Sequence, residues 1–568
     1  MTRADDALAG SRPASPPAGR RPARRRRAGR AAGLAAAAVV LFLCYLRLSG
    51  TVPVNADGAS NALQAWDMLH GNVLLHGWRL SDVSFYTTEL PQYALVEAVR
   101  GLAPEVVHIA AAMTYTLLVL LAGLLAKGRA TGREAVLRAG IATGIMLAPQ
   151  PGSASYTLLL SPDHVGTGVP LLVLWLIIDR ARPRWYVPVT AGVLLAWVQV
   201  ADSGTLIIGV APVVIACCVR ACRRDASRRY HLSLAAAAVA SVPAAALAVR
   251  LIHGLGGYSV YAPRTSLSPA GALPRHLALA SQGVLELFGA GFAGQRPGLA
   301  VLFAVAHLAG LALAGLALGL AIGRFFRWEE LVIPGLAAAI ILNLAAYILS
   351  VTPVNIRSTR EIASVLPFGA VLAGRLLAGP MLQAVGRLRA ANRLARADRP
   401  EGADRPEGTG RPPRAGRLIP ITLASAAAAA ALCYAAALGY DAAQSPVAAN
   451  DQALAGWLAG HHLTAGLAKY WHANNTTLDS GGRVQLITVA VRDGRPVFGD
   501  PRETDLSWRD PRSHYANFVV TAGRPAGQAR LMAQALLTTL GRPARTYRFE
   551  EYTIRVWDRN LLSVLGRT

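Results

Sequence analysis

The sequence has 568 residues, of which 53% are hydrophobic and only 16% are charged, and its formal net charge at pH 7 is +25. The apolar residues come in blocks of about 20, each long enough to cross a bilayer, and this excludes an ordinary soluble protein. The arginines flank these blocks and are not interleaved with aromatic residues, which argues against a nucleic-acid partner. The sequence therefore indicates a polytopic helical membrane protein that lies in a lipid bilayer.

Eleven apolar blocks are predicted to be transmembrane helices. They lie at residues 31–49, 105–126, 137–150, 165–178, 185–200, 203–219, 231–252, 298–322, 331–351, 361–378 and 419–440. With a cytoplasmic N-terminus, the arginine-rich connections between blocks also fall in the cytoplasm, as the positive-inside rule requires. Residues 50–104, the loop 253–297 and everything after about residue 440 then lie outside. We therefore expect a multi-pass protein of the cell membrane with an extracytoplasmic C-terminal segment.

Two segments are too polar to form a core. Residues 1–30 form a basic cytoplasmic tail, and residues 386–417 form a linker that contains ADRPEG twice in succession. Proline, glycine and charge dominate the linker, so both segments are expected to be disordered. The transmembrane domain is expected to occupy residues 31–440.

The C-terminal residues 441–568 have a different character. β-Branched and aromatic residues predict strands at 483–491, 517–521 and 551–558, and helical patterns occupy 452–460 and 526–541. About 120 residues suffice for one compact α/β domain. The segment has no glycine-rich phosphate loop, nucleophile elbow or metal motif, so an accessory role is expected. The predicted fold is thus an all-α polytopic membrane domain followed by a small α/β domain.

The stretch VPVNADGASNALQAWDMLHGN, residues 52–72, follows the first apolar block. From Gly58 onward its apolar residues recur at helical spacing, and polar residues take the other face. This pattern predicts an amphipathic helix in the outer membrane interface, with its aromatic and leucine side in lipid. Asp57 lies just before the first turn, where it is suited to cap the helix. A carboxylate at this place is equally suited to chemistry, and the local sequence leaves both interpretations open.

Two motifs point to a family. ADGASNALQAWDMLHGN resembles an acid followed by an amphipathic juxtamembrane helix and Gly-Asn, and STREIASVLPFGAVLAGRLL, residues 358–377, is similar to a late span preceded by a basic residue. Together with the topology, they resemble the GT-C superfamily of membrane glycosyltransferases, which includes protein O-mannosyltransferases, aminoarabinose transferases and oligosaccharyltransferases. Many relatives carry a second acid where this chain has Gly58, and Glu89 in TTELPQY is a candidate substitute.

The resemblance implies transfer of a hexose or pentose from a polyprenyl-phosphate carrier to an extracytoplasmic acceptor. Inverting displacement at the anomeric carbon needs a carboxylate to take the proton of the acceptor hydroxyl, and Asp57 matches that position. The leaving phosphate needs cations, for which Arg357 and Arg360 are the candidates. Contact with lipid headgroups is the alternative role for both arginines.

Other polar residues of the predicted outer segments are further substrate-binding candidates: Asp67, Asp163, His164, Asp202, Arg275 and His276. A carboxylate beside an imidazole, as in Asp163–His164, can bind a divalent metal or position substrate, and a capping role is the alternative. The aromatic residues in Lys469–Thr477 could stack on sugars or pack in the domain core. The sequence requires no cofactor and leaves metal dependence open.

Two other functions compete with the glycosyltransferase. A transporter or lipid flippase predicts paired ionisable residues at mid-membrane and repeats between the two halves of the chain. Neither feature is found. The acids cluster at the outer ends of the apolar blocks and not at mid-membrane, and no inverted repeat is visible in the sequence. A non-catalytic scaffold with an outer binding domain is not separated from an enzyme by the sequence.

Overall fold

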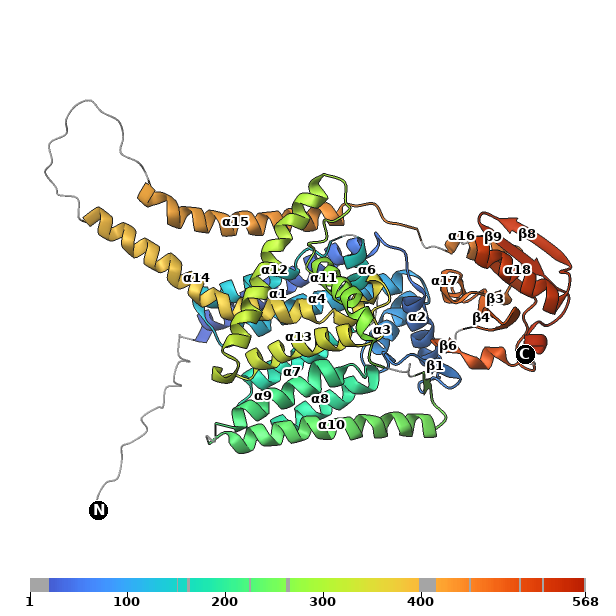
Figure 1. The fold of residues 1–568 in the computed structure, drawn as a ribbon, viewed down its shortest axis with the longest axis horizontal. Helices are drawn as coiled ribbons and strands as arrows, with labels where there is room; N and C mark the ends of the chain where they lie inside the picture. Colours follow the sequence, from blue (N-terminus) through green and yellow to red (C-terminus); the bar gives the residue numbers. More distant parts are fainter. Residues whose placement is uncertain are drawn as a thin grey trace, which may run out of the picture.

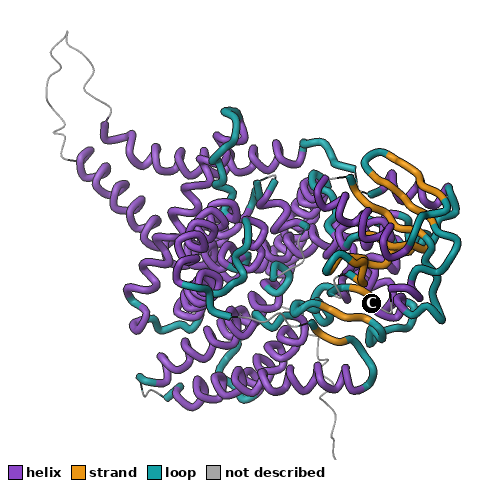
Figure 2. Tube along the Cα trace, turned by 45° about the vertical axis from the view of Figure 1, so that its right-hand side comes forward, coloured by secondary structure: helices purple, strands orange, loops and turns teal. Residues whose placement is uncertain are grey.

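The structure is a computed structural model that describes residues 20–150, 152–160, 164–223, 226–261, 266–397, 415–448, 451–499, 502–523 and 526–565. Figure 1 shows a bundle of long helices with a smaller domain at one end. Strands are confined to that end, as Figure 2 shows. The expected fold class, a helical membrane domain followed by a small α/β domain, is confirmed.

Each of the eleven predicted apolar blocks coincides with a helix. These helices are α1 (Arg20–Ser49), α4 (Glu105–Lys127), α5 (Gly132–Met146), α7 (Gly168–Arg180), α8 (Tyr186–Ala201), η1 with α9 (Leu206–Val210 and Ala211–Ala221), α10 (Arg228–Gly254), α12 (Leu299–Gly323), α13 (Val332–Leu349), α14 (Val365–Ala397) and α15 (Ala415–Ala442). Among the described residues, six helices are long and apolar enough to cross a membrane: α1 from Ala31, α4, α10, α12, α13 and α14 up to Arg387. The chain is therefore a multi-pass membrane protein.

Three helices extend into segments that were expected to be disordered. Helix α1 begins at Arg20 within the basic tail, and within the linker α14 continues to Ala397 and α15 begins at Ala415. Alanine, leucine and arginine are strong helix formers, so a helix that begins in an apolar block can continue into such sequence. Residues 1–19 and 398–414, which include the ADRPEG repeat, lie outside the described residues.

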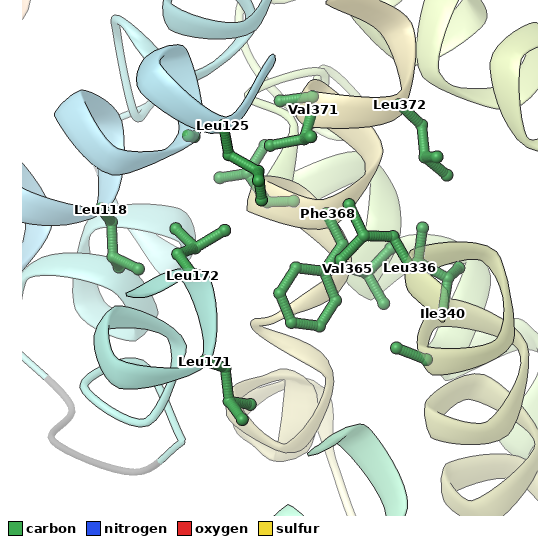
Figure 3. Packing of buried hydrophobic residues seen from close by; sticks show 14 of the residues in the cluster. Leu118, Leu125, Leu171, Leu172, Leu336, Ile340, Val365, Phe368, Val371 and Leu372 are labelled. Carbon is green, nitrogen blue, oxygen red and sulfur yellow. The ribbon is translucent and has the colours of Figure 1, made fainter. Parts of the chain in front are cut away.

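The bundle core is built around α4, α7, α13 and α14. Figure 3 shows Leu118, Leu172, Leu336 and Phe368 from these four helices meeting in one buried cluster. A Cβ at Gly335 would lie 2.1 Å from the ring of Trp175, so glycine allows α13 to approach α7. Small residues at helix contacts are typical of membrane proteins, where packing and not water exclusion holds helices together.

The C-terminal domain is a six-stranded sheet with helices on both faces. The strand order is β5-β4-β3-β7-β9-β8, in which β4, β3 and β7 are parallel and the other pairs antiparallel. Its elements are α16 (Gln452–Gly460), β3 (Ala465–Ala468), α17 (Tyr470–Asp479), β4 (Gln485–Arg492), β5 (Arg495–Phe498), η5 (Leu506–Arg509), β7 (Phe518–Ala522), α18 (Ala526–Leu540), β8 (Arg545–Phe549), β9 (Tyr552–Val556) and α19 (Leu562–Leu565). The three predicted strands and two predicted helices are confirmed.

Short elements lie in the connections between the long helices and at the contact with this domain. They are α2 (Ala56–Leu69), β1 (Trp78–Leu80), α3 (Leu90–Arg100), α6 (Ser153–Leu159), β2 (Ser259–Val260), η2 (Ala270–Ala272), α11 (Leu273–Leu287), η3 (Phe325–Arg327), η4 (Ile356–Ile362) and β6 (Thr504–Asp505). Strands β2, β1 and β6 form one small sheet, although they come from three segments far apart in the sequence. This sheet holds the C-terminal domain beside α2 (Figure 1).

Helix α2 does not lie in lipid along its length, contrary to the prediction. Every residue from Ala56 to Ala65 is buried, so both faces of the helix are covered. Helices α3 and α4 contact α2, and α17 of the C-terminal domain packs on it as well. The polar face of α2, which was expected to face water, instead packs against the C-terminal domain. The local sequence does not encode this contact.

Candidate active site

Asn55, and not Asp57, caps helix α2. Its backbone is extended, and its side-chain oxygen accepts a hydrogen bond from the N–H of Gly58 at 2.7 Å. This geometry is that of an N-cap residue. Helix α2 begins at Ala56, so Asp57 lies inside the first turn. The capping interpretation of Asp57 is therefore wrong, and its carboxylate is available for other contacts.

The Asp57 carboxylate meets Arg360, which is 303 residues further along the chain. Nη1 of Arg360 donates to Oδ2 of Asp57 at 3.0 Å. The Asp57 side chain is 10% exposed and that of Arg360 is 33% exposed. Arg360 lies on the short helix η4, whose first turn is capped by Asn355 through a hydrogen bond from the N–H of Arg357. A partly buried carboxylate and guanidinium thus face each other at the end of the bundle.

The C-terminal domain reaches the same carboxylate. The hydroxyl of Tyr470, the first residue of α17, lies 2.7 Å from Oδ1 of Asp57 and 2.7 Å from Oε2 of Glu503. The hydroxyl of Ser81 donates to Oε1 of Glu503 at 2.9 Å. Burial, together with Glu503 and Asp57, raises the pKa of Tyr470 well above its usual value, so the phenol is neutral. The sequence predicted only an accessory role for the C-terminal domain and did not predict this contact between Tyr470 and Asp57.

A second cluster contains Glu361 of η4, together with His164 and Asp202. Nδ1 of His164 lies 2.6 Å from Asp202, and Nε2 lies 2.8 Å from Glu361, the residue that follows Arg360. Thr167 also donates to Asp202, at 2.6 Å. Burial disfavours the charged imidazole, but the two carboxylates outweigh it and hold the pKa of His164 well above its usual value. His164 is therefore a cation that connects the α8–η1 turn to the segment carrying Arg360.

Asp82 belongs to the surroundings of this cluster. Burial raises the pKa of its carboxyl, Glu361 raises it further, and His164 opposes both effects. Around η4 the described acids Asp57, Asp82, Asp202 and Glu361 outnumber the described cations, which are Arg357, Arg360 and His164. Within the residues that the structure describes, no group of three or more His, Cys, Asp or Glu side chains is arranged to hold a metal ion. Asp163, the predicted partner of His164 in metal binding, lies outside those residues.

Arg357 lies on η4 together with Arg360 but has a different environment. Its guanidinium lies over the ring of Tyr156 at 5.2 Å from the ring centre. Both residues line a cavity of about 500 Å³ between the bundle and the C-terminal domain, together with Asn55 and Trp471. The cavity adjoins the start of α2. Arg357 therefore presents a second cation of η4 at this cavity.

The remaining predicted residues have structural partners away from Asp57. Asp67 accepts hydrogen bonds from Asn72 at 2.6 Å and from the Trp78 indole at 2.9 Å, and so holds the turn after α2. Glu89 is buried at the start of α3, bonded to Thr88, and its side chain lies against Gly166.

Two of them lie on α11. Arg275 donates to the carbonyl of Val354 at 2.5 Å, and the buried His276 lies 3.0 Å from the carbonyl of Ile348. These bonds tie α11 to the end of α13 and to the α13–η4 connection. The structure therefore does not bring Arg275 or His276 to the Asp57 carboxylate.

Three residues of the site were not singled out from the sequence: Tyr470, Glu503 and Glu361. Tyr470 lies in a stretch noted only for its aromatic residues, and Glu503 lies in a loop with no pattern of its own. Glu361 directly follows Arg360, and that adjacency was the one available signal. Their roles follow from contacts across hundreds of residues, which local spacing does not encode.

The structure was compared with known proteins. No protein-family model and no curated protein sequence matches this chain. Among solved structures, ArnT from Cupriavidus metallidurans bound to undecaprenyl phosphate superposes with a TM-score of 0.51 at 13% identity, over 93% of this chain and 98% of that one. The chain has a GT-C fold.

Two further structures are similar to a lesser degree. The apo state of the same ArnT gives a TM-score of 0.48 at 11% identity, over 95% of this chain and 99% of that one. The apo oligosaccharyltransferase of Archaeoglobus fulgidus gives 0.47 at 12% identity, over 93% of this chain and 75% of that one.

Proposed function

We propose that the protein is an integral membrane glycosyltransferase that transfers a sugar from a polyprenyl-phosphate carrier to an extracytoplasmic acceptor. The observation that carries the proposal is the 3.0 Å contact between Asp57 and Arg360 at the end of a GT-C fold. A carboxylate and a guanidinium are the two groups that this transfer needs: a base for the acceptor and a cation for the departing phosphate. ArnT, which shares the fold, has been crystallised with undecaprenyl phosphate.

In the proposed reaction, Asp57 takes the proton of the acceptor hydroxyl as the oxygen forms a bond to the anomeric carbon. The bond between that carbon and the phosphate oxygen breaks, and its electron pair leaves with the phosphate. Arg360, with Arg357 beside it, stabilises the charge that grows on the phosphate. Attack on the face opposite the leaving group inverts the anomeric configuration. The transferred sugar is a hexose or a pentose.

The first test is a transfer assay with the purified full chain and a panel of polyprenyl-phosphate sugars. Asp57→Asn should lower transfer by about 100- to 10,000-fold, because an amide cannot take up the proton. The variant should still fold, since Asn55 caps the helix, and its melting temperature should fall only by the loss of the ion pair with the partly exposed Arg360.

Asn55→Ala is the matched control for that variant. It removes the cap, which costs about 1 kcal/mol of stability, and it keeps the carboxylate of Asp57. Near-normal transfer by a folded Asp57→Asn protein would contradict the assignment of the base. No transfer by the wild type with any donor in the panel would contradict the proposed function.

A further inference from the structure

The cavity beside the start of α2 is lined by both parts of the molecule. The membrane domain contributes Asn55, Tyr156 and Arg357, and α17 of the C-terminal domain contributes Trp471 and His472. The cavity volume of about 500 Å³ lies within the range of about 300–1,000 Å³ that is usual for small-molecule sites. Such sites combine aromatic surface with a few precisely placed polar groups. Of this lining, the proposed reaction uses only Arg357.

His472 is held in one orientation by two buried partners. Its Nδ1 lies 2.9 Å from Oδ1 of Asp451, and the hydroxyl of Tyr552 donates to the same oxygen at 2.7 Å. Asp451 and Tyr552 are buried, whereas the His472 side chain is 24% exposed. Because the carboxylate oxygen accepts, Nδ1 carries a proton, and Nε2 has no hydrogen-bond partner among the residues that the structure describes. A carboxylate that fixes one ring nitrogen leaves the other one aimed at a ligand.

Two buried oxygens of the same lining lack partners. Asn475 of α17 donates from Nδ2 to the carbonyl of Val54 at 3.4 Å, and this bond fixes which end of the amide is the oxygen. Within the described part of the chain, neither Oδ1 of Asn475 nor Oδ2 of Asp451 accepts a hydrogen bond. Both residues line the cavity. Buried acceptors of this kind are rare, and a hydroxyl-bearing ligand can satisfy them directly or through a bridging water.

Trp471 supplies a flat apolar surface at the same cavity. It is 52% exposed, although tryptophan is usually well buried. Its ring meets the ring of Tyr470 edge to face, with the ring centres 5.2 Å apart. Tyr470 is the residue whose hydroxyl contacts Asp57. A ligand that packs on Trp471 therefore lies beside the side chain that reaches the proposed base.

The charges of the lining indicate the class of ligand. Arg357 from the membrane domain and Glu551 from the C-terminal domain are both exposed, and both line the cavity. Charges of both signs match neither a polyanion nor an acyl chain. Each hydroxyl of a sugar both donates and accepts, so it pairs with groups of either sign. The C–H groups on one face of a sugar ring carry a small positive charge and pack on the negative face of an aromatic ring.

We propose that this cavity is a sugar-binding subsite, in which Trp471 stacks on the sugar ring and Nε2 of His472 accepts a hydrogen bond from one of its hydroxyls. Asp451 and Tyr552 are positioning residues, because they act through His472. The inference rests on the proposed function and extends it, since the C-terminal domain then takes part in substrate recognition. The carrier-linked donor and a carbohydrate acceptor are two sources of such a ring, and both offer the same chemistry.

Saturation-transfer NMR of the purified full chain with free glucose, mannose, galactose and arabinose tests the subsite. An amine-oxide detergent is needed, because maltoside detergents carry sugar headgroups. Trp471→Ala should weaken sugar binding by roughly three- to tenfold, as expected for loss of one stacked aromatic contact. Tyr515→Ala is the matched control, because Tyr515 is also 52% exposed on the same domain and does not line the cavity. Its sugar binding should equal that of the wild type.

The orientation of His472 is tested with a second set of variants. His472→Ala should weaken sugar binding by roughly three- to tenfold, the effect of one lost neutral hydrogen bond. Asp451→Asn keeps an oxygen that accepts from His472 and Tyr552, so it should bind sugar like the wild type. Asp451→Ala should bind sugar like His472→Ala. The proposal is overturned if no free sugar binds to the wild type, or if either Trp471→Ala or His472→Ala binds sugar as tightly as Tyr515→Ala. Weakened binding in Asp451→Asn would refute the positioning role.

Competition identifies the source of the ring. If the cavity takes the donor sugar, a polyprenyl-phosphate sugar should displace the free sugar, and polyprenyl phosphate alone should not. If it takes the acceptor, the free sugar should stay bound in the presence of that donor. Binding is measured without turnover, so the two proposals can fail separately. Sugar binding that depends on Trp471, in a protein that transfers nothing, would keep the subsite and refute the proposed function; transfer without such binding would do the reverse.

Discussion

At the scale of single residues, Arg360 is the side chain around which the site is arranged. A guanidinium presents N–H donors in a fixed plane, a geometry that matches carboxylate and phosphate oxygens. It contacts Asp57 at 3.0 Å and lies 3.9 Å from Glu361. Arg357 contributes a second cation, stacked over Tyr156. The donor phosphate and the Asp57 carboxylate are both negative. The two guanidinium groups offset the repulsion between them, so this arrangement suits a phosphate bound near the proposed base.

Replacement of Arg360 by alanine should weaken binding of the lipid-phosphate donor by about 1.5–3 kcal/mol, the range for a hydrogen bond to a charged group. Lysine should restore part of this, because it keeps the charge and loses the forked geometry. Donor affinity can be measured by thermophoresis of the purified protein. Arg129→Ala, which alters an arginine that donates to the carbonyl of Asp179, is the control. Equal donor affinity in Arg360→Ala and wild type would assign Arg360 to the membrane surface.

At the scale of elements, the His164 cluster joins three segments that are far apart in the sequence. His164 precedes α7, Asp202 follows α8, and Glu361 lies on η4. The imidazole contacts both acids, and the N–H of Gly204 donates to Asp202 at 2.8 Å. Because η4 also carries Arg360, the position of the proposed phosphate ligand depends on this connection.

The His164 cluster predicts a pH dependence of stability. The pKa of His164 is raised, so its contribution is complete below the unfolded value of about 6.5 and is lost as pH rises through the higher folded value. Burial raises the pKa values of Asp202 and Glu361, but His164 outweighs it and lowers both. Their contribution is therefore present above about pH 4 and lost as pH falls further. The connection should be most stable between these limits.

Melting temperatures of the detergent-solubilised protein should thus fall as pH rises from 7 towards 10. In His164→Asn the fall should be smaller, and at pH 7 the variant should be less stable by roughly 3 kcal/mol, the cost of breaking a buried pair. His70→Asn changes an exposed histidine that bonds within α2, and its curve should run parallel to wild type. If the melting temperature of His164→Asn falls as much as that of the wild type between pH 7 and 10, titration of His164 is not the cause of the fall.

At the scale of the whole molecule, the two ends of the bundle differ in charge. Arg129, Pro183, Ser227 and Glu329, from four separate connections, line one cavity at one end. The same connections carry Arg182, Arg223 and Arg327. Figure 1 shows the C-terminal domain at the other end. By the positive-inside rule, we propose that the arginine-rich end lies in the cytoplasm. We propose that Asp57 and the C-terminal domain face outside.

A reporter fusion tests this orientation. Alkaline phosphatase fused after Thr568 should be active in a bacterial host, because the enzyme folds only outside the cytoplasm. Phosphatase fused after Arg327, in the connection between α12 and α13, should be inactive. The reverse pattern would place the Asp57 site in the cytoplasm and remove the basis for an extracytoplasmic acceptor.

The sequence by itself determined the membrane class, the helical blocks and the presence of a C-terminal α/β domain. These features follow from hydrophobic runs and from side-chain periodicity, which are local properties. It also pointed to Asp57, Arg357 and Arg360 through short motifs. The choice between cap and base at Asp57 could not be made locally, because a carboxylate and an amide two residues apart are both good caps.

Only the tertiary structure decided what Asp57 contacts. Arg360 and Tyr470 lie 303 and 413 residues away in the chain and meet the two oxygens of one carboxylate. No spacing in the sequence encodes such contacts, because they depend on how the bundle and the C-terminal domain pack against α2. The same packing buries the polar face of α2, which its amphipathic pattern had placed in the membrane interface. Periodicity predicts that a face will be covered or exposed, but the partner that covers it comes from the fold.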